Sequence, residues 1–318
     1  MSHNKRILII LGAFFVLAVI LVAGFKKITE KKKESGSQNP IPKILENKIT
    51  DKERNDYFLK TNFIDENGST PFNTLTDGAV VFDQETGQIL YTKNPDFKGP
   101  TASISKIMTA VIVLENANLN KEITVSKNAA SQIPNSMDLK EGEKLKAEDL
   151  MYGMMMLSAN DASFALAEGT LGYDNFVKAM NDKAKWLELK NTNFTNPAGL
   201  DDSNHKSSAY DLGVITRYAI KKYPQILKYM GQKEDINIPK TDKHGAHWLY
   251  HISDMLKIYP GMDGAKTGYT WEAGHTFIGT ALRDKRLVVV VLNSQNPNSD
   301  ITNLLDYGFM VVGKVKNP

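Results

Sequence analysis

The residues with the clearest catalytic potential are Ser103 and Lys106, within the stretch PTASISKIMTA at residues 100–110. Residues three positions apart share one face of a helix, so a helix that begins near Ser103 places the two side chains together. A serine hydroxyl is a poor nucleophile until a base removes its proton, and a lysine serves as that base when burial or a nearby positive charge lowers its pKa. The spacing predicts a nucleophile and its base. Ser105 is a rival by residue type, although at i+2 from Ser103 it projects to a different face.

Two further short motifs follow along the chain. Ser158-Ala159-Asn160 supplies a hydroxyl and an amide that can relay a proton or hold a substrate. A structural role as the cap of a helix starting near Ala162 is also open to Ser158 or Asn160, and the two roles are compatible. Lys266-Thr267-Gly268 offers an ammonium group and a hydroxyl for a carboxylate, and a glycine that lets a ligand approach the backbone. Its alternative is a solvent-facing lysine on an edge strand. Each motif alone is weak evidence of function.

The apolar periodicity predicts the elements that position these motifs. Ser103–Asn116 reads as a helix that is buried nearly all round, and residues 264–270 read as a strand. The second motif lies at the break between two of the helices predicted over Ala147–Leu157, Ala162–Leu171, Tyr173–Leu187 and Ala209–Lys222.

Strands are predicted on both sides of this helical block. Gly78–Asn94 reads as a hairpin, and Thr276–Arg283 with Arg286–Ser294 reads as a second hairpin before a final helix over Asp300–Val312. This order predicts an α/β (α+β) domain in which the first and last strands share one antiparallel sheet and the helices are inserted between them.

The three motifs in this order resemble the signature of penicillin-binding proteins and serine β-lactamases. Within that group the chain resembles the low-molecular-mass D-alanyl-D-alanine carboxypeptidases, the S11 serine peptidases, over about residues 72–312. The blocks LMYGMMMLSANDAS, FTNPAGLDD, HKSSAYDLGVI and YPGMDGAKTGYTWEAG are also similar to this family. The resemblance implies a DD-peptidase/β-lactamase-like fold, with a five-stranded antiparallel sheet, an inserted all-α subdomain and a site between them.

The resemblance also implies a role for each motif residue. Ser103 would attack a D-Ala-D-Ala peptide bond and form an acyl-enzyme, and Lys106 would take its proton. Ser158 and Asn160 would complete the proton network and orient the substrate, while Lys266, Thr267 and Gly268 would bind its terminal carboxylate. The backbone N–H groups of Ser103 and Tyr269 would form the oxyanion hole. The expected partners are peptidoglycan stem peptides that end in D-Ala-D-Ala, and β-lactam antibiotics as covalent inhibitors; no cofactor is expected.

Other functions stay open at this point. Short members of the family include endopeptidases that cut peptidoglycan cross-links, so the substrate could be a cross-linked peptide and not a stem peptide. A β-lactamase would need a deacylating base, and nothing marks Glu272, near the cleft, as one. A catalytically silent wall-binding scaffold is the alternative outside the enzymes, and the intact motifs argue against it.

The N-terminal segment predicts attachment to a membrane. Residues 7–25 contain no charge over 19 positions and would form a helix about 28 Å long, close to the hydrocarbon thickness of a bilayer. We therefore divide the chain into an anchor at 1–25, a polar stalk at 26–70 and a catalytic domain at 71–318, which would face the cell wall. Cleavage as a signal peptide is the alternative. The lysines among residues 26–33 count against this orientation, because basic residues favour the cytoplasmic side.

Charge and composition exclude several other functions. The net charge of +3 is the sum of +6 in residues 1–60, which hold 12 basic and six acidic side chains, and −3 in the remainder. The positive charge therefore belongs to the arm next to the membrane, and no nucleic-acid partner is expected. The absence of cysteine excludes disulfides, thiolate nucleophiles and zinc ribbons.

One histidine cluster could bind a metal ion. His244, His247 and His251 have the spacing i, i+3, i+7, which would place them on one face of a helix. No carboxylate joins them in a recognised zinc pattern. We therefore interpret them as a polar loop–helix edge near the mouth of the cleft, and no metal site is predicted.

Overall fold

A computed structural model of the 318-residue chain describes residues 51–60 and 74–316. The predicted anchor at residues 1–25 lies outside the described residues, as do residues 26–50 and 61–70 of the predicted stalk. Within the described ranges, no helix is both long enough and apolar enough to cross a bilayer.

A five-stranded antiparallel sheet forms the centre of the domain, in the order β2-β1-β9-β8-β7. Its strands are β1 (Gly78–Asp83), β2 (Ile89–Lys93), β7 (Met262–Thr270), β8 (Gly274–Leu282) and β9 (Arg286–Ser294). The first strand of the chain thus pairs with the last, as the sequence predicts, and the insertion of the helices between them is confirmed.

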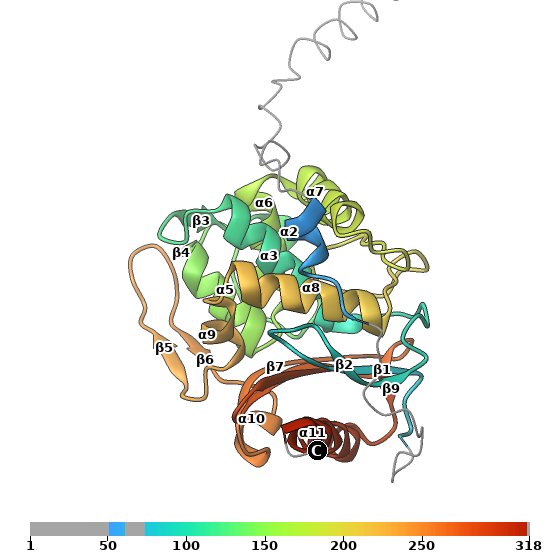
Figure 1. Cartoon of the computed structure of the whole chain (residues 1–318). Helices are drawn as coiled ribbons and strands as arrows, with labels where there is room; N and C mark the ends of the chain where they lie inside the picture. The colour runs from blue at the N-terminus through green and yellow to red at the C-terminus, as the bar shows by residue number, and fades with distance from the viewer. Residues whose placement is uncertain (1–50, 61–73, 317–318) are drawn as a thin grey trace, which may run out of the picture. The chain divides into compact units, whose positions relative to one another are not determined.

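The middle strand β9 explains why this sheet is stable. Val288–Val291 is a continuous apolar run whose members are fully buried. A strand has a continuous apolar sequence, with no alternation of apolar and polar residues, when both faces of its sheet are covered. One face packs against α11 (Pro297–Lys316), and the other packs against the helical part of the domain through α8 (Ala209–Lys222) (Figure 1).

The helical part lies between β2 and β7 in the sequence. Besides α8, its helices are α3 (Lys106–Asn116), α4 (Lys127–Ala130), α5 (Ala147–Met156), α6 (Asn160–Thr170), α7 (Tyr173–Trp186) and α9 (Ile226–Met230). A last short helix, α10 (Met255–Ile258), comes directly before β7. Two short antiparallel pairs accompany them: β3 (Glu122–Thr124) with β4 (Lys144–Lys146), and β5 (Ile236–Ile238) with β6 (His247–Leu249).

Residues 51–60 differ from the predicted stalk, because they pack on the domain. After α2 (Asp51–Asn55), the buried side chains of Tyr57 and Leu59 cover α8, and the ring of Tyr57 meets that of Tyr218 edge-on at 4.9 Å. Lys60 forms a parallel bridge with Gln88. The sequence did not predict this packing, because Tyr57 and Leu59 are only two alternating apolar residues in a charged stretch, and two residues are too few to indicate a strand. Residues 51–60 and 74–316 accordingly belong to one compact unit.

The buried Arg217 of α8 holds this segment in place. Its guanidinium donates hydrogen bonds to the backbone carbonyl oxygens of Gln84 and Glu85, at 2.9 and 2.6 Å, and to that of Phe58 at 3.5 Å. Five N–H donors in one plane suit this role, since a single side chain can join three chain segments.

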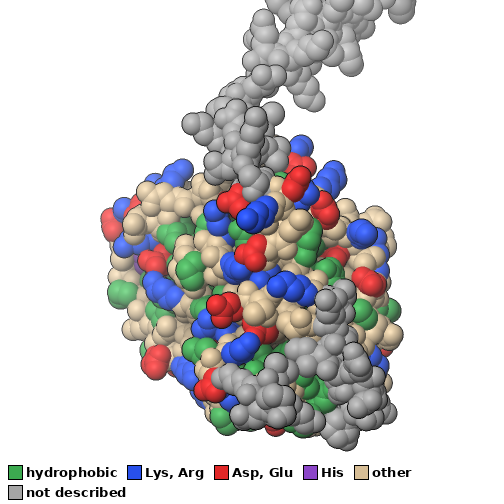
Figure 2. Space-filling model, in the orientation of Figure 1, with side chains coloured by type: hydrophobic (Ala, Val, Ile, Leu, Met, Phe, Trp, Pro, Cys, Tyr) green, Lys and Arg blue, Asp and Glu red, His purple; other side chains and the backbone are tan. Residues whose placement is uncertain are grey.

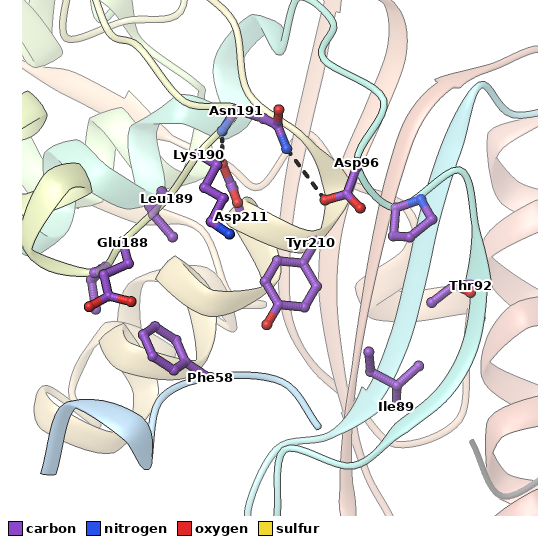
Figure 3. A pocket seen from close by; sticks show the side chains of 12 residues that line it. Phe58, Ile89, Thr92, Asp96, Glu188, Leu189, Lys190, Asn191, Tyr210 and Asp211 are labelled. Atoms are coloured by element: carbon purple, nitrogen blue, oxygen red, sulfur yellow. Dashed lines mark hydrogen bonds between the residues drawn. The ribbon is translucent and has the colours of Figure 1, made fainter. Parts of the chain in front are cut away.

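A pocket of about 450 Å³ lies beside this segment (Figure 3). Phe58, Tyr210 and Ile89 line it, together with the exposed carboxylates of Asp96 and Glu188. The pocket contains none of the motif residues predicted for catalysis. On the face drawn in Figure 2, basic and acidic side chains are intermixed over the described residues, and no one-sign patch stands out.

Candidate active site

The candidate nucleophile Ser103 lies in a tight turn in front of α3. Ala102–Ser105 form a 3-10 turn, and α3 continues from Lys106, so the predicted helix is present with a tighter first turn. Ala102 adopts a φ of +47°, which is unusual for a residue other than glycine. Ser103 is half-buried, and Lys106 to Val113 are all buried, as the apolar periodicity predicts.

Lys106 is fully buried and points at three oxygen atoms. Its Nζ lies 2.7 Å from Ser103 Oγ, 2.8 Å from Asn160 Oδ1 and 2.7 Å from the carbonyl oxygen of Ala198. Burial lowers its pKa well below the usual value for lysine, and the charge of Lys266 lowers it further, against a smaller opposing effect of Asp161. A lysine in this position can therefore lose its proton and accept another from Ser103.

Ser158 and Asn160 are buried where α5 gives way to α6. Ser158 has a φ of +62°, so the chain turns sharply between the two helices. Asn160 accepts from Lys106 and donates through Nδ2 to the carbonyl oxygen of Ile133 at 2.9 Å. The capping alternative is wrong, because α6 begins at Asn160 and its N-cap position is Ala159, which makes no side-chain cap.

Asp161 holds the loop that faces this motif. Its buried carboxylate accepts hydrogen bonds from the backbone N–H groups of Met137, Leu139 and Ala162, all at 2.7–3.0 Å. Sequence reasoning assigned no chemistry to this residue. An acidic side chain in the first turn of a helix is the local signal for such a role, because it faces unpaired N–H groups.

Lys266 brings the third motif next to the second. Its side chain, 1% exposed on β7, donates to Ser158 Oγ at 2.8 Å and to the carbonyl oxygen of Thr267 at 2.7 Å. Burial lowers its pKa to about 7. The alternative of a solvent-facing lysine is therefore wrong.

Gly268 lets β7 approach the turn that carries Ser103. A Cβ atom at this position would lie 2.8 Å from the backbone nitrogen of Ser103 and 2.5 Å from Thr276 Oγ1. The close neighbour is thus the chain itself, whereas the sequence suggested a ligand. Beyond it, Tyr269 is half exposed and Trp271 is 93% exposed at the end of the strand.

One group of the site, the backbone carbonyl of Ala198, could not be predicted from the type of its side chain. The carbonyl oxygen of Ala198 contacts Lys106, and it belongs to the loop Asn196–Leu200. Asn196 Oδ1 accepts from the backbone N–H groups of Ala198, Gly199 and Leu200 and so folds this loop around itself. The Asn-Pro and Gly residues of the block predict a turn, but they do not predict what the turn contacts.

The three motifs therefore meet in one place. Lys106 joins Ser103 to Asn160, and Lys266 joins β7 to Ser158, two residues before Asn160. Two buried lysines and two serine hydroxyls next to each other form an arrangement suited to moving a proton from a hydroxyl while holding an anionic ligand. Glu272 is exposed in the turn after β7.

The histidine cluster does not form the predicted helix edge. His247 begins strand β6, and its Nδ1 lies 3.1 Å from the carbonyl oxygen of Met137. His244 instead contacts the carbonyl oxygen of Gly245. Among the residues that the structure describes, no group of three His, Cys, Asp or Glu could hold a metal ion, so the metal alternative is not supported.

A family model described as Peptidase_S11, D-alanyl-D-alanine carboxypeptidase, matches residues 65–296. The chain belongs to this family. The match covers the complete set of motif residues from Ser103 to Tyr269 and agrees with the resemblance seen in the sequence.

Two named relatives show the extent of the similarity. D-alanyl-D-alanine carboxypeptidase DacF of Bacillus subtilis is 38% identical over 73% of this chain and 61% of its own length. DacA of Haemophilus influenzae is 33% identical over 76% of this chain and 64% of its own length. The matched segment thus spans less than two thirds of either relative. A Pseudomonas aeruginosa relative named D-alanyl-D-alanine endopeptidase is 31% identical over 68% of this chain and 70% of its own length.

The fold is that of the DD-peptidases. The crystal structure of a D-alanyl-D-alanine carboxypeptidase from Mycobacterium tuberculosis has a TM-score of 0.71 and 30% identity, and it covers 77% of this chain and 95% of that one. The predicted fold class, with its five-stranded antiparallel sheet and flanking helices, is confirmed.

Proposed function

We propose that this chain is a serine D-Ala-D-Ala carboxypeptidase that trims peptidoglycan stem peptides. The observation that carries the proposal is the distance of 2.7 Å between Lys106 Nζ and Ser103 Oγ, with the lysine fully buried. Its lowered pKa makes the neutral amine accessible, which a general base near neutral pH requires. Membership of the family supports the same activity.

Acylation begins at the Ser103 hydroxyl. Its proton passes to Lys106 Nζ while Oγ attacks the carbonyl carbon of the penultimate D-Ala. The backbone N–H groups of Ser103 and Tyr269 would stabilise the negative oxygen of the tetrahedral intermediate. The C–N bond then breaks, the Lys106 ammonium returns its proton to the leaving D-Ala amine, and an ester on Ser103 remains. Water attacks this ester while Lys106 takes a proton from it. The bond between the acyl carbon and Ser103 Oγ then breaks, the Lys106 ammonium returns the proton to Oγ, and the shortened peptide leaves as a carboxylic acid.

The other motif residues would bind and orient the substrate. Lys266 and Thr267 would bind the terminal carboxylate beside Gly268, since a charged Lys266 attracts an anion strongly in a dry site. Ser158 would link Lys266 to the proton network, and Asn160 would hold Lys106 against the substrate amide. A β-lactam would acylate Ser103 in the same way as the peptide.

We further propose that the catalytic domain works outside the cytoplasm, attached through residues 7–25 and a basic stalk. The support is the uncharged run of 19 residues. The family's substrate in the cell wall favours the same side of the membrane, despite the lysines at residues 26–33.

A labelled penicillin tests the catalytic proposal. We expect a stable covalent adduct on the wild-type protein and none on Ser103→Ala. Ser299→Ala removes an exposed serine hydroxyl on α11, which covers the face of the sheet opposite the helical part; it is the control and should label normally. The absence of a wild-type adduct, or an undiminished adduct on Ser103→Ala, would contradict the proposal.

Product analysis separates the related activities. Incubation with a pentapeptide should release D-Ala faster than incubation with a cross-linked dimer releases monomer. Preference for the dimer would indicate an endopeptidase, which the name of the Pseudomonas aeruginosa relative makes the nearest alternative. Rapid turnover of penicillin would indicate a β-lactamase, and muropeptide binding without D-Ala release would indicate a scaffold.

A further inference from the structure

A buried histidine lies behind the turn that carries Ser103, and the proposed chemistry does not use it. His205 is 2% exposed, and its Nε2 lies 2.7 Å from Ser105 Oγ. The Ser105 hydroxyl in turn lies 2.6 Å from Thr101 Oγ1. Thr101 and Ser105 lie at the two ends of the Ser103 turn. Both side chains are buried, so the hydrogen bonds that join them to His205 are shielded from water.

The direction of these hydrogen bonds follows from the other ring nitrogen. The backbone N–H of Thr195 donates to His205 Nδ1 at 3.2 Å, which requires the proton of the neutral ring to be on Nε2. The ring then donates to Ser105 Oγ, and the hydroxyls of Ser105 and Thr101 share the next hydrogen bond. Burial is the main cause that lowers the pKa of His205 to about 4; the charge of Asp202 opposes this shift, and the charges of Lys106 and Lys206 add to it. The ring is therefore neutral at neutral pH.

The same histidine contacts the loop that supplies the Ala198 carbonyl. Thr195, whose N–H binds the ring, immediately precedes Asn196, the residue that folds the loop Asn196–Leu200. A Cβ atom on Gly199, where φ is +81°, would lie 1.9 Å from the carbonyl oxygen of Ala102. The loop therefore packs directly on the turn that carries the nucleophile.

We propose that His205 is a positioning residue for acylation, joining the Ser103 turn to the loop that orients Lys106. One ring nitrogen acts through Ser105 on the turn, and the other acts through Thr195 on the Ala198 carbonyl. His205 itself does not touch the substrate. The inference rests on the proposed function, since it concerns the rate at which Ser103 is acylated.

The conformation of the turn gives this role a physical reason. Ala102 has a positive φ, and such a residue persists only when its surroundings hold it in place. His205, through Ser105, is one of these constraints. Displacing a nucleophile by about 1 Å can reduce a rate by roughly 100-fold, so a small relaxation of the turn is sufficient.

The test measures acylation by a fluorescent penicillin in the full chain. In His205→Leu the hydrogen bonds at both ring nitrogens are lost. We expect the maximal acylation rate of folded protein to fall about 10- to 100-fold with little change in half-saturation. His205→Gln keeps an N–H donor near the Nε2 position and should recover part of this loss. Ser105→Ala leaves the histidine in place and should be slowed in the same direction.

Two controls separate an effect of His205 on the acylation rate from an effect on the stability of the fold. Thr216→Val removes a hydroxyl that is equally buried but lies on α8, bonded to Leu212, and it should acylate at the wild-type rate per folded molecule. If His205→Leu does not fold, Ser105→Ala carries the test, because it removes a single oxygen atom.

The outcomes also distinguish this inference from the proposed function. Lack of acylation in the wild-type protein would overturn the function itself. Normal wild-type acylation, with His205→Leu equally fast per folded molecule, would overturn only the positioning role; where His205→Leu does not fold, an equally fast Ser105→Ala would do the same. A slow His205→Leu and a partly restored His205→Gln would support it.

Discussion

At the scale of single residues, the site depends on two buried lysines with different partners. Lys106 contacts the hydroxyl of Ser103, and Lys266 contacts that of Ser158. Both have lowered pKa values because burial disfavours the ammonium form, and the charge of Lys266 adds to the effect on Lys106. The same arrangement can therefore supply a base and, when Lys266 is charged, a cation for the carboxylate.

The lowered pKa of Lys266 predicts how substrate binding depends on pH. Below a pKa of about 7 the ammonium is charged and binds the carboxylate, and above it the charge is lost. The KM for a D-Ala-D-Ala peptide should therefore rise with pH above 7, by up to about tenfold per pH unit. A KM that stays constant between pH 6.5 and 9 would contradict the assignment.

Lys266→Arg is the matched variant for this prediction. A guanidinium stays charged throughout this range, so the rise of KM with pH should disappear, even if the longer side chain weakens binding overall. Steady-state kinetics of D-Ala release across the pH range provide the measurement. An alkaline rise that is unchanged in Lys266→Arg would assign it to another group.

At the scale of elements, the site depends on how closely β7 approaches the turn before α3. The strand bears Lys266, and the turn bears Ser103, so their spacing determines whether the proposed carboxylate site and the proposed nucleophile fit one substrate. Gly268 allows this spacing because it has no Cβ atom to meet the backbone of the turn.

Gly268→Ala should reduce acylation more than stability. The new methyl group would lie within 3.0 Å of Ser103 N and of Thr276 Oγ1, so the strand or the turn must move. We expect the rate of penicillin acylation to fall about 100-fold, as a displacement near 1 Å predicts. The melting temperature should fall only slightly, because the edge strand can shift outward.

Gly313→Ala is the matched control. No atom lies within 4 Å of the corresponding Cβ position, and the residue is exposed on α11. Replacing this helical glycine should leave acylation unchanged and stabilise the domain by up to about 1 kcal/mol. Equal acylation rates for the two variants would show that the approach of β7 is not limiting.

At the scale of the whole molecule, the folded domain includes residues 51–60, although the composition of this segment resembles a polar stalk. Arg217 joins residues 56–60 to the turn between β1 and β2, and Tyr57 packs on Tyr218. Substitutions in this segment should therefore lower the free energy of unfolding of the domain, which substitutions in a linker would not do.

Arg217→Met tests this connection. The variant leaves carbonyl oxygens of Gln84 and Glu85 without their donor, and we expect a loss of about 1.5–3 kcal/mol, as for hydrogen bonds to charged groups. Urea denaturation gives the stability, and hydrogen exchange should increase at residues 56–60. Lys178→Met is the control: its ion pair with Asp182 lies on the exposed side of α7, so the change should stay below about 1 kcal/mol.

The sequence by itself determined the features that depend on local spacing. The i, i+3 relation of Ser103 to Lys106, the two hairpins, the apolar helix α3 and the order of the three motifs can all be read from neighbouring residues, because helix and strand periodicities are local. These features also carried the correct family and fold class.

Only the tertiary structure decided what surrounds those residues. Lys106 meets Asn160 across 54 positions, Lys266 meets Ser158 across 108, and Ser105 meets His205 across 100. The Ala198 carbonyl carries no side-chain signal, since every residue has one. The lowered pKa values of both lysines arise from desolvation by elements distant in sequence, which is a property of packing, so no pattern of neighbouring residues contains it.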